Sequence, residues 1–201
     1  LELIIIDDAS TDKSFAIATS YKNKYPRLIT LLRSNKCLNK EGEAPSNIGI
    51  KCARGKYIAR MDADDISCPT RIEKQVSFLE THSDIFLVAS NAYIIDKEGR
   101  IIGEKIDLAK PQEIYKEYLS FHLTTVNPII NPSSMYRRLL KDKKVFKYDL
   151  KYPAANDYYT LFKLICDGYR FYNLQEKLIY YRIHGKNNTL TRIKEKSMIV
   201  S

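Results

Sequence analysis

Several features that would identify a class of protein are missing from this sequence. No apolar run approaches the roughly 20 residues that a membrane-spanning helix needs. The spacing of the four cysteines fits neither a zinc site nor a small disulfide scaffold and favours reduced intracellular thiols. No recognisable nucleic-acid-binding module is present, which makes nucleic acid a weak candidate partner. The cysteines are Cys37, Cys52, Cys68 and Cys166.

The sequence does contain enough apolar residues for a sizeable core, and it has a strong excess of positive charge. Its 201 residues are 44% hydrophobic, which suits one α/β domain, and the formal net charge is +9. Much of the charge lies late in the chain, in residues 137–151 and 182–196. Such an excess of positive charge can bind nucleic acid, anionic lipid or a phosphorylated substrate. It can equally belong to a surface that is simply exposed to solvent.

The start of the chain has the pattern of a strand, a helix and a second strand. The apolar run Leu1–Ile6 predicts a buried parallel strand, residues 14–21 predict a helix, and residues 28–32 predict the next strand. This order predicts a parallel sheet with right-handed crossovers. Asp8 then lies beyond the carboxyl end of a strand, where open α/β sheets bind ligands. It can contact a nucleotide base or ribose, or it can cap the helix, a need that Asp12 already fills.

A second group of acids follows the strand predicted over residues 56–61. Asp62 and Asp64 are two residues apart, so in an extended chain their carboxylates point to the same side. Two such carboxylates suit a hard divalent ion, because Mg²⁺ and Mn²⁺ take oxygen ligands and often share them with a substrate's phosphates. Asp65 adds a third carboxylate. The alternative is an acidic surface turn that closes the strand.

The rest of the chain alternates between predicted helices and strands. A helix that opens near Pro69 should bury Ile72, Val76 and Leu79. The other predicted elements are helices over 44–53, 111–121 and 156–167, strands over 85–95 and 133–138 with a hairpin return at 100–102, and two late strands over 169–174 and 178–183.

Two late polar residues have both a functional and a structural interpretation. Asp157, in the first turn of the helix over 156–167, can favour the helix dipole, or it can act as a general base that accepts a hydroxyl proton. His184 follows a strand, precedes Gly185 and stands among cations, which is compatible with an exposed site role. A lone histidine is more often structural.

Together, four stretches resemble the inverting family 2 nucleotide-sugar glycosyltransferases. Each motif alone is weakly specific, but their order and spacing match the family across nearly the whole chain. The resemblance implies the GT-A fold, a Rossmann-like α/β/α sandwich with a mainly parallel central sheet and a small antiparallel C-terminal extension. One departure is Asn156, where the family usually has Glu. The four stretches are Ile4–Asp12, Gly55–Asp65, Asn156–Tyr158 with its helix end at Asp167–Tyr169, and Tyr180–Gly185.

The resemblance implies a role for each matching position. Asp8 would contact the nucleotide base, and Asp62 would lie near the ribose. Asp64 would hold a divalent metal, Mn²⁺ or Mg²⁺, on the diphosphate, and His184 would reach the metal or the diphosphate. Asp157 would be the catalytic base that activates the acceptor hydroxyl.

The resemblance also implies partners and an organisation. The donor would be a nucleoside-diphosphate sugar, UDP-linked by expectation, and the acceptor a polysaccharide or a lipid-linked glycan. Residues 1–201 would form one domain, with a nucleotide-sugar-binding half over 1–95 and an acceptor-binding half over 96–201. We expect a further strand–helix unit of about 30 residues before Leu1. The expected setting is bacterial cell-envelope polysaccharide biosynthesis, in the cytoplasm at the inner face of the plasma membrane.

Two other classes of protein remain open on the sequence alone. A phosphotransferase of the haloacid dehalogenase type also carries Asp-x-Asp after a strand, with the first Asp as nucleophile. Here Asp65-Ile66 stands where such proteins usually have Gly-Thr or a similar pair. The second alternative is a basic module that binds nucleic acid or anionic lipid without catalysis.

Overall fold

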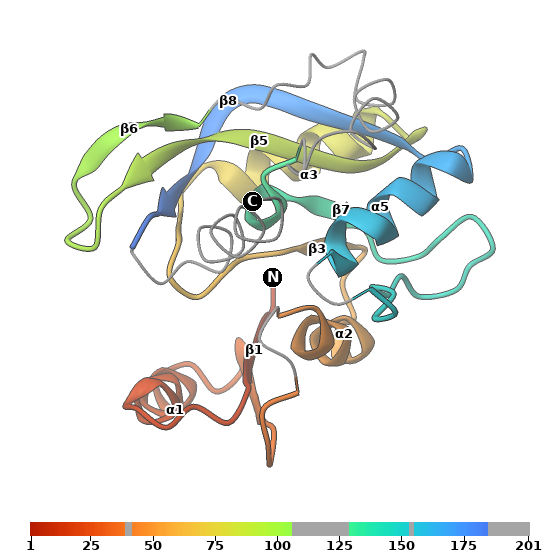
Figure 1. Cartoon of the computed structure of the whole chain (residues 1–201). Helices are drawn as coiled ribbons and strands as arrows, with labels where there is room; N and C mark the ends of the chain where they lie inside the picture. The colour runs from red at the N-terminus through yellow and green to blue at the C-terminus, as the bar shows by residue number, and fades with distance from the viewer. Residues whose placement is uncertain (39–41, 106–128, 153–154, 185–201) are drawn as a thin grey trace, which may run out of the picture. The chain divides into compact units, whose positions relative to one another are not determined.

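The chain contains two compact units, which are described separately below (Figure 1). In the described part of the chain, no helix is long and apolar enough to cross a membrane. All four cysteines are free thiols. The helix predicted over 111–121 lies outside the described residues, and the functional halves 1–95 and 96–201 stay a prediction. The computed structural model describes residues 1–38, 42–105, 129–152 and 155–184; unit 1 comprises 1–58 and 137–164, and unit 2 comprises 59–136 and 165–201.

Unit 1 is built on a two-stranded parallel sheet. β1 (Leu3–Asp7) pairs with β2 (Ile29–Arg33), and α1 (Ser14–Lys24) connects them. This confirms the strand–helix–strand order predicted for the start of the chain. The carboxylate of Asp12 accepts a hydrogen bond from the backbone N–H of Ser14 at 2.8 Å, but the N-cap of α1 is Lys13, so the cap predicted at Asp12 was placed one residue too early.

The helix α2 (Glu43–Cys52) packs against β1 and is tied to a distant part of unit 1. Gly49 faces β1, and a Cβ at this position would lie at an ordinary contact distance, 3.6 Å, from the Ile6 side chain. The Asn47 side chain exchanges two hydrogen bonds with the backbone of Tyr148, donating at 2.9 Å and accepting at 2.7 Å. Asn47, a weak helix former, therefore makes a specific contact from within the helix.

The late helix α5 (Asn156–Cys166) matches its prediction closely. Its predicted apolar side, Leu161, Leu164 and Ile165, is buried. The chain leaves the helix at Gly168, which has a positive φ of 78°, a conformation that glycine adopts without steric cost.

Unit 2 contains a mixed sheet around the long strand β5 (Ile85–Ile95), whose bounds are those predicted. β5 runs parallel to β8 and antiparallel to β6 and β7, and β4 pairs antiparallel with β8. The parallel pairing predicted for the sheet therefore occurs in β1–β2 and β5–β8, whereas β4, β6 and β7 pair antiparallel and correct the prediction. The boundary between the units falls within β3 (Tyr57–Ala59), β7 and α5. The remaining elements are β4 (Ile66–Ser67), α3 (Arg71–Thr81), β6 (Ile101–Lys105), η2 (Asn131–Ser133), β7 (Met135–Arg137) and β8 (Arg170–Arg182).

The two strands predicted over 169–174 and 178–183 are one continuous strand, β8. The prediction was wrong because the polar run 175–177 has the composition of a turn. In the structure the pairing of β8 with β5 shifts register near Asn91, whose side-chain amide donates to the carbonyl of Gln175 at 2.9 Å. A bulge at this point keeps the strand continuous while its polar run faces solvent.

The buried side of α3 also differs from the prediction. Leu79 is buried as expected, but Ile72 and Val76 are only half-buried. Arg71 and Gln75 take the central positions instead, and Arg71 is 1% exposed. Apolar periodicity located this helix correctly but misjudged which of its sides faces the core.

Arg71 can be buried because its guanidinium is surrounded by acceptors. Its Nη2 donates to the carbonyls of Arg60 at 2.8 Å and Ser134 at 3.2 Å, and its Nε donates to Gln75 Oε1 at 3.0 Å. Burial lowers the pKa of Arg71 to about 10, so the side chain stays charged at neutral pH. Gln75 extends the network by donating to the carbonyl of Ser133 at 2.7 Å. The helix is therefore joined by hydrogen bonds to two other segments of unit 2.

Replacing Arg71 with Met should destabilise the chain by about 3 kcal/mol, because the carbonyl of Arg60 and the Gln75 amide lose a buried donor. The matched control is Arg100→Met, whose side chain is mostly exposed; its cost should stay within about 0.5 kcal/mol. Urea unfolding followed by circular dichroism measures both changes. Equal losses in the two variants would contradict the importance of the buried guanidinium.

Candidate functional site

The acidic segment that follows β3 forms a turn in unit 2. The backbone N–H of Asp65 donates to the carbonyl of Asp62 at 3.3 Å. The buried Arg60 forms an ion pair with the Asp62 carboxylate, with Nη2 and Oδ1 3.2 Å apart. The backbone N–H of Arg60 also donates to the carbonyl of Ser134 at 2.9 Å. The residues that lead into the turn are thus fixed by buried contacts, while the carboxylates after them reach the surface.

The side chain of Asp64 contacts that of His184, which follows β8. His184 Nε2 lies 3.0 Å from Asp64 Oδ2, although 120 residues separate them in the sequence. The antiparallel pairing of β4 with β8 explains the contact, because it sets Ile66 opposite Tyr180. Both side chains of the Asp64–His184 pair are partly exposed, so a ligand can reach them.

Arg182 connects this pair to the turn between β5 and β6. Its backbone N–H donates to Asp65 Oδ1 at 2.8 Å, and its Nε donates to the carbonyl of Asp64 at 2.7 Å. Its Nη1 donates to the carbonyls of Asp96 at 2.7 Å and Lys97 at 3.1 Å. Arg182 therefore links the acidic turn, the end of β8 and the neighbouring hairpin.

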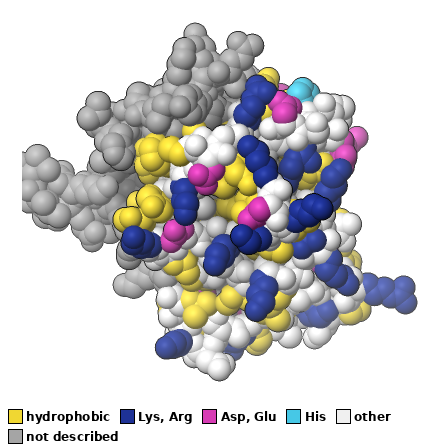
Figure 2. All heavy atoms as spheres, turned by 90° about the vertical axis from the view of Figure 1, so that its right-hand side faces the viewer, with side chains coloured by type: hydrophobic (Ala, Val, Ile, Leu, Met, Phe, Trp, Pro, Cys, Tyr) yellow, Lys and Arg dark blue, Asp and Glu magenta, His cyan; other side chains and the backbone are white. Residues whose placement is uncertain are grey.

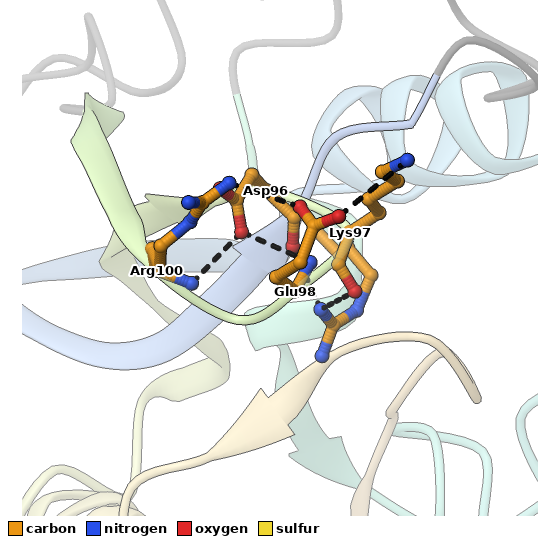
Figure 3. Close-up of polar contacts among 5 residues, drawn as sticks. Asp96, Lys97, Glu98 and Arg100 are labelled. Carbon is orange, nitrogen blue, oxygen red and sulfur yellow. Dashed lines mark hydrogen bonds and ion pairs between the residues drawn. The ribbon is translucent and has the colours of Figure 1, made fainter.

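The hairpin turn that Arg182 contacts is held by its own charges (Figure 3). The Asp96 carboxylate accepts hydrogen bonds from the backbone N–H groups of Glu98 at 3.0 Å and Arg100 at 2.9 Å. The Arg100 side chain pairs with Asp96 at 2.7 Å and with Glu98 at 3.2 Å. The turn thus gives Arg182 a fixed pair of carbonyl acceptors.

The donor set of unit 2 fits a divalent ion that shares its ligands with a substrate. Asp64 offers a carboxylate and His184 offers an imidazole nitrogen within one hydrogen-bonding distance. Among the residues that the structure describes, no group of three or more His, Cys, Asp or Glu side chains could hold a metal. Two protein ligands suit Mg²⁺ or Mn²⁺, because these ions keep several positions for water and phosphate oxygens.

Asp8 lies in unit 1, directly after β1. Its carboxylate accepts a hydrogen bond from the backbone N–H of Leu38 at 2.9 Å, and the Cys37 thiol donates to it at 3.4 Å. Neither contact is with the first turn of α1, so these contacts do not make Asp8 a helix cap. The preceding Asp7 has a different role: it is buried and paired with Arg33 at 3.0 Å.

Asp157 also lies in unit 1, in the first turn of α5, and its side chain is half-buried. Its Oδ1 accepts a hydrogen bond from the backbone N–H of Tyr158 at 2.7 Å. The buried Asn156 fixes the start of the helix, because its Oδ1 accepts from the backbone N–H of Tyr152 at 3.1 Å. The start of the helix is therefore held by a side-chain hydrogen bond, and the residue that carries the carboxylate is partly exposed.

The structure thus brings together two of the predicted site residues, Asp64 and His184, with Asp62 in the same turn. Asp8 and Asp157 belong to the other unit, and the roles predicted for them stay predictions. Sequence reasoning assigned no role to Arg60 or Arg182. Both lie inside stretches that carry the family resemblance, Gly55–Asp65 and Tyr180–Gly185. Their place in these stretches was the one sequence feature that could have indicated a role for them.

Comparison with known proteins assigns the chain to a family. The family model described as "Glycosyl transferase family 2" matches residues 1–145. The chain belongs to this family. It is 36% identical over 197 residues to an uncharacterized glycosyltransferase of Methanocaldococcus jannaschii, covering 98% of this chain and 64% of that protein. It is 34% identical to the putative glycosyltransferase EpsE of Bacillus subtilis, covering 95% of this chain and 65% of EpsE.

A relative with a specified reaction is the Escherichia coli protein WfaP, a UDP-Glc:alpha-D-GlcNAc-diphosphoundecaprenol beta-1,3-glucosyltransferase. It is 29% identical, and the match covers 97% of this chain and 70% of WfaP. The chain spans somewhat less than two thirds of the length of the Methanocaldococcus protein and of EpsE.

Solved structures confirm the GT-A fold. Staphylococcus aureus TarS superposes with a TM-score of 0.62 at 20% identity, over 90% of this chain and 51% of the TarS chain. The mannosyltransferase PcManGT of Pyrobaculum calidifontis, solved with GDP-Man and Mn²⁺, gives a TM-score of 0.66 at 19% identity, over 100% of this chain and 53% of its own. Family and fold together favour the glycosyltransferase interpretation over a phosphotransferase and over a basic binding module.

Replacing Arg182 with Gln should loosen the acidic turn, because the carbonyl of Asp64 loses a charge-assisted hydrogen bond. The backbone amides of residues 62–67 should exchange with deuterium about tenfold faster, the factor expected for the loss of one such bond. Hydrogen exchange with mass spectrometry measures this. Arg170→Gln, at the other end of β8, removes only an exposed pair with Asp84 and should leave the segment unchanged. Unchanged exchange in Arg182→Gln would contradict the link.

Proposed function

We propose that the chain transfers a sugar from a nucleoside-diphosphate sugar to a hydroxyl acceptor, with inversion at the anomeric carbon. The observation that carries this proposal is the contact between Asp64 Oδ2 and His184 Nε2 at 3.0 Å, beside Asp62, in a chain of glycosyl transferase family 2. A paired carboxylate and imidazole with open neighbouring positions suits a metal–diphosphate complex.

On this proposal, each site residue has the role that the family resemblance implies. Asp64 and His184 would hold Mn²⁺ or Mg²⁺ on the diphosphate, Asp62 would lie near the ribose, and Asp8 would contact the nucleotide base. When bound, the ion would neutralise the negative charge that develops on the β-phosphate of the leaving group. Arg182, two residues before His184, binds the carbonyl of Asp64 and the carboxylate of Asp65. These hydrogen bonds hold the acidic turn beside the end of β8.

Asp157 acts as the general base in this proposal. Its carboxylate accepts the proton of the acceptor hydroxyl as that oxygen attacks the anomeric carbon from the face opposite the leaving diphosphate. The new bond is sugar carbon to acceptor oxygen, and the bond that breaks is sugar carbon to phosphate oxygen. One such displacement inverts the anomeric centre. The start of α5 fixes the carboxylate in place through the buried contacts of Asn156.

The donor and acceptor classes are proposed from the names of relatives. WfaP is named for UDP-Glc and for an acceptor carried on diphosphoundecaprenol, and TarS is named as a poly(ribitol-phosphate) beta-N-acetylglucosaminyltransferase. We therefore propose a UDP-sugar donor and a lipid-linked or polymeric glycan acceptor in polysaccharide biosynthesis. A lipid-linked acceptor would place the reaction at the inner face of the plasma membrane.

The metal role is tested by Asp64→Asn. Titration calorimetry with UDP should show that Mn²⁺ tightens binding in the parent chain and has no effect in the variant, because a neutral amide is a far weaker ligand for a hard cation. Asp84→Asn, on an exposed carboxylate elsewhere in unit 2, should bind like the parent. Unchanged metal-dependent affinity in Asp64→Asn would reject the assignment.

The base role is tested by Asp157→Asn. The variant should bind the donor normally but transfer sugar about 10² to 10⁴ times more slowly, since the amide cannot accept the proton. Asp167→Asn, just beyond the other end of α5, is the control and should keep the parent rate. Transfer by Asp157→Asn at the parent rate would rule out its role as the base.

A further inference from the structure

A short hairpin in unit 1 carries charge and apolar surface that the proposed chemistry does not use. Residues 138–146 form this basic hairpin, in which Leu139 and Val145 are an antiparallel bridge pair. The backbone N–H of Phe146 donates to the carbonyl of Arg138 at 2.9 Å, and that of Leu140 donates to the carbonyl of Lys144 at 2.8 Å. Backbone hydrogen bonds therefore hold these residues in a defined hairpin.

The two faces of the basic hairpin have opposite environments. Phe146 is 1% exposed and packs edge-on against the buried ring of Tyr148, with ring centroids 5.1 Å apart. Successive residues of an extended strand point to opposite faces, so Val145 points away from this core. Leu139 lies directly opposite Val145 and shares its face. Their exposed fractions are 42% and 39%, so this apolar pair faces solvent.

Exposed lysines lie close to this apolar pair in the sequence. Lys141, Lys143 and Lys144 are exposed in the turn, and Lys147 is exposed just after it. The one acidic residue in the hairpin, Asp142, pairs with Lys144 at 2.8 Å. With four basic residues, Arg138, Lys141, Lys143 and Lys144, against one acid, the hairpin has a net positive charge. Figure 2 shows a face of the molecule on which Lys and Arg side chains gather with hydrophobic side chains between them.

The β5–β6 hairpin provides a contrast within the same chain. It also exposes apolar side chains, with Ile101 57% exposed. Its turn, however, contains two acids and two bases that pair with one another: Asp96 and Glu98 with Arg100, and Lys97 with Glu98 (Figure 3). Exposed apolar surface occurs on both hairpins, but only the basic hairpin combines it with unbalanced positive charge.

We infer that the basic hairpin is a docking surface for an anionic membrane. Leu139 and Val145 would enter the interface between headgroups and acyl chains, and the lysines would contact lipid phosphates. The exposed apolar pair favours a membrane over an anionic polymer, because a polymer of phosphates offers no apolar environment to these two side chains. The inference rests on the proposed function, in which a lipid-linked acceptor is presented at a membrane surface.

Binding to lipid vesicles tests the inference independently of catalysis. The chain should co-sediment with phosphatidylcholine vesicles that contain phosphatidylglycerol, and much less with phosphatidylcholine alone. Replacing Lys141 and Lys147 with Gln should weaken binding about 25-fold, about fivefold for each lysine. The pair Leu139→Ser and Val145→Thr should also weaken it, whereas Ile101→Ser on the other hairpin should not.

Several outcomes would overturn the inference. These are equal binding to both kinds of vesicle, parent-like binding by the lysine or apolar variants, or binding to polyphosphate with none to vesicles. Mn²⁺-dependent binding of UDP in vesicle-free solution separates this inference from the proposed function. The hairpin variants should keep the parent affinity for UDP, which also shows that they are folded. Vesicle binding by a parent chain that shows no Mn²⁺-dependent binding of UDP would refute the function and leave the docking surface standing.

Discussion

The buried guanidinium of Arg71 is the constraint on which unit 2 depends. A charge in the core is costly unless acceptors surround it, and here the acceptors are backbone carbonyls of two separate segments. Satisfying Arg71 therefore fixes where the chain runs at Arg60 and Ser134. Because Arg60 is two residues before Asp62, the same contacts fix the origin of the acidic turn.

A second arginine holds the other end of that turn. Arg182 binds Asp64 and Asp65 on one side and the β5–β6 turn on the other, and His184 follows two residues later. The position of Asp64 against His184 is thus a consequence of strand pairing and of two polar anchors, one buried and one near the surface. Such an arrangement leaves the carboxylate and the imidazole available while their backbone is held.

Much of the fold could be predicted from the sequence, since long apolar runs and punctuating residues determine the bounds of β5 and α5. The buried side of α3 could not be predicted, because Arg71 and Gln75 are residue types that usually lie on the surface. The carbonyls that accept their hydrogen bonds come from segments distant in the sequence. The continuity of β8 was missed because charged side chains on a strand imitate a turn. The proximity of Asp64 and His184 came only from resemblance to a family, since no local pattern connects residues so far apart.

The central claim is that Asp64 and His184 hold one divalent ion together with a nucleoside diphosphate. Pulsed electron paramagnetic resonance of Mn²⁺ bound to the chain with UDP tests it directly, by detecting nitrogen nuclei coupled to the ion. The account predicts a histidine nitrogen coupling in the parent chain and in His82→Gln, and its loss in His184→Gln. A parent complex without this coupling, or one that keeps it in His184→Gln, would contradict the account.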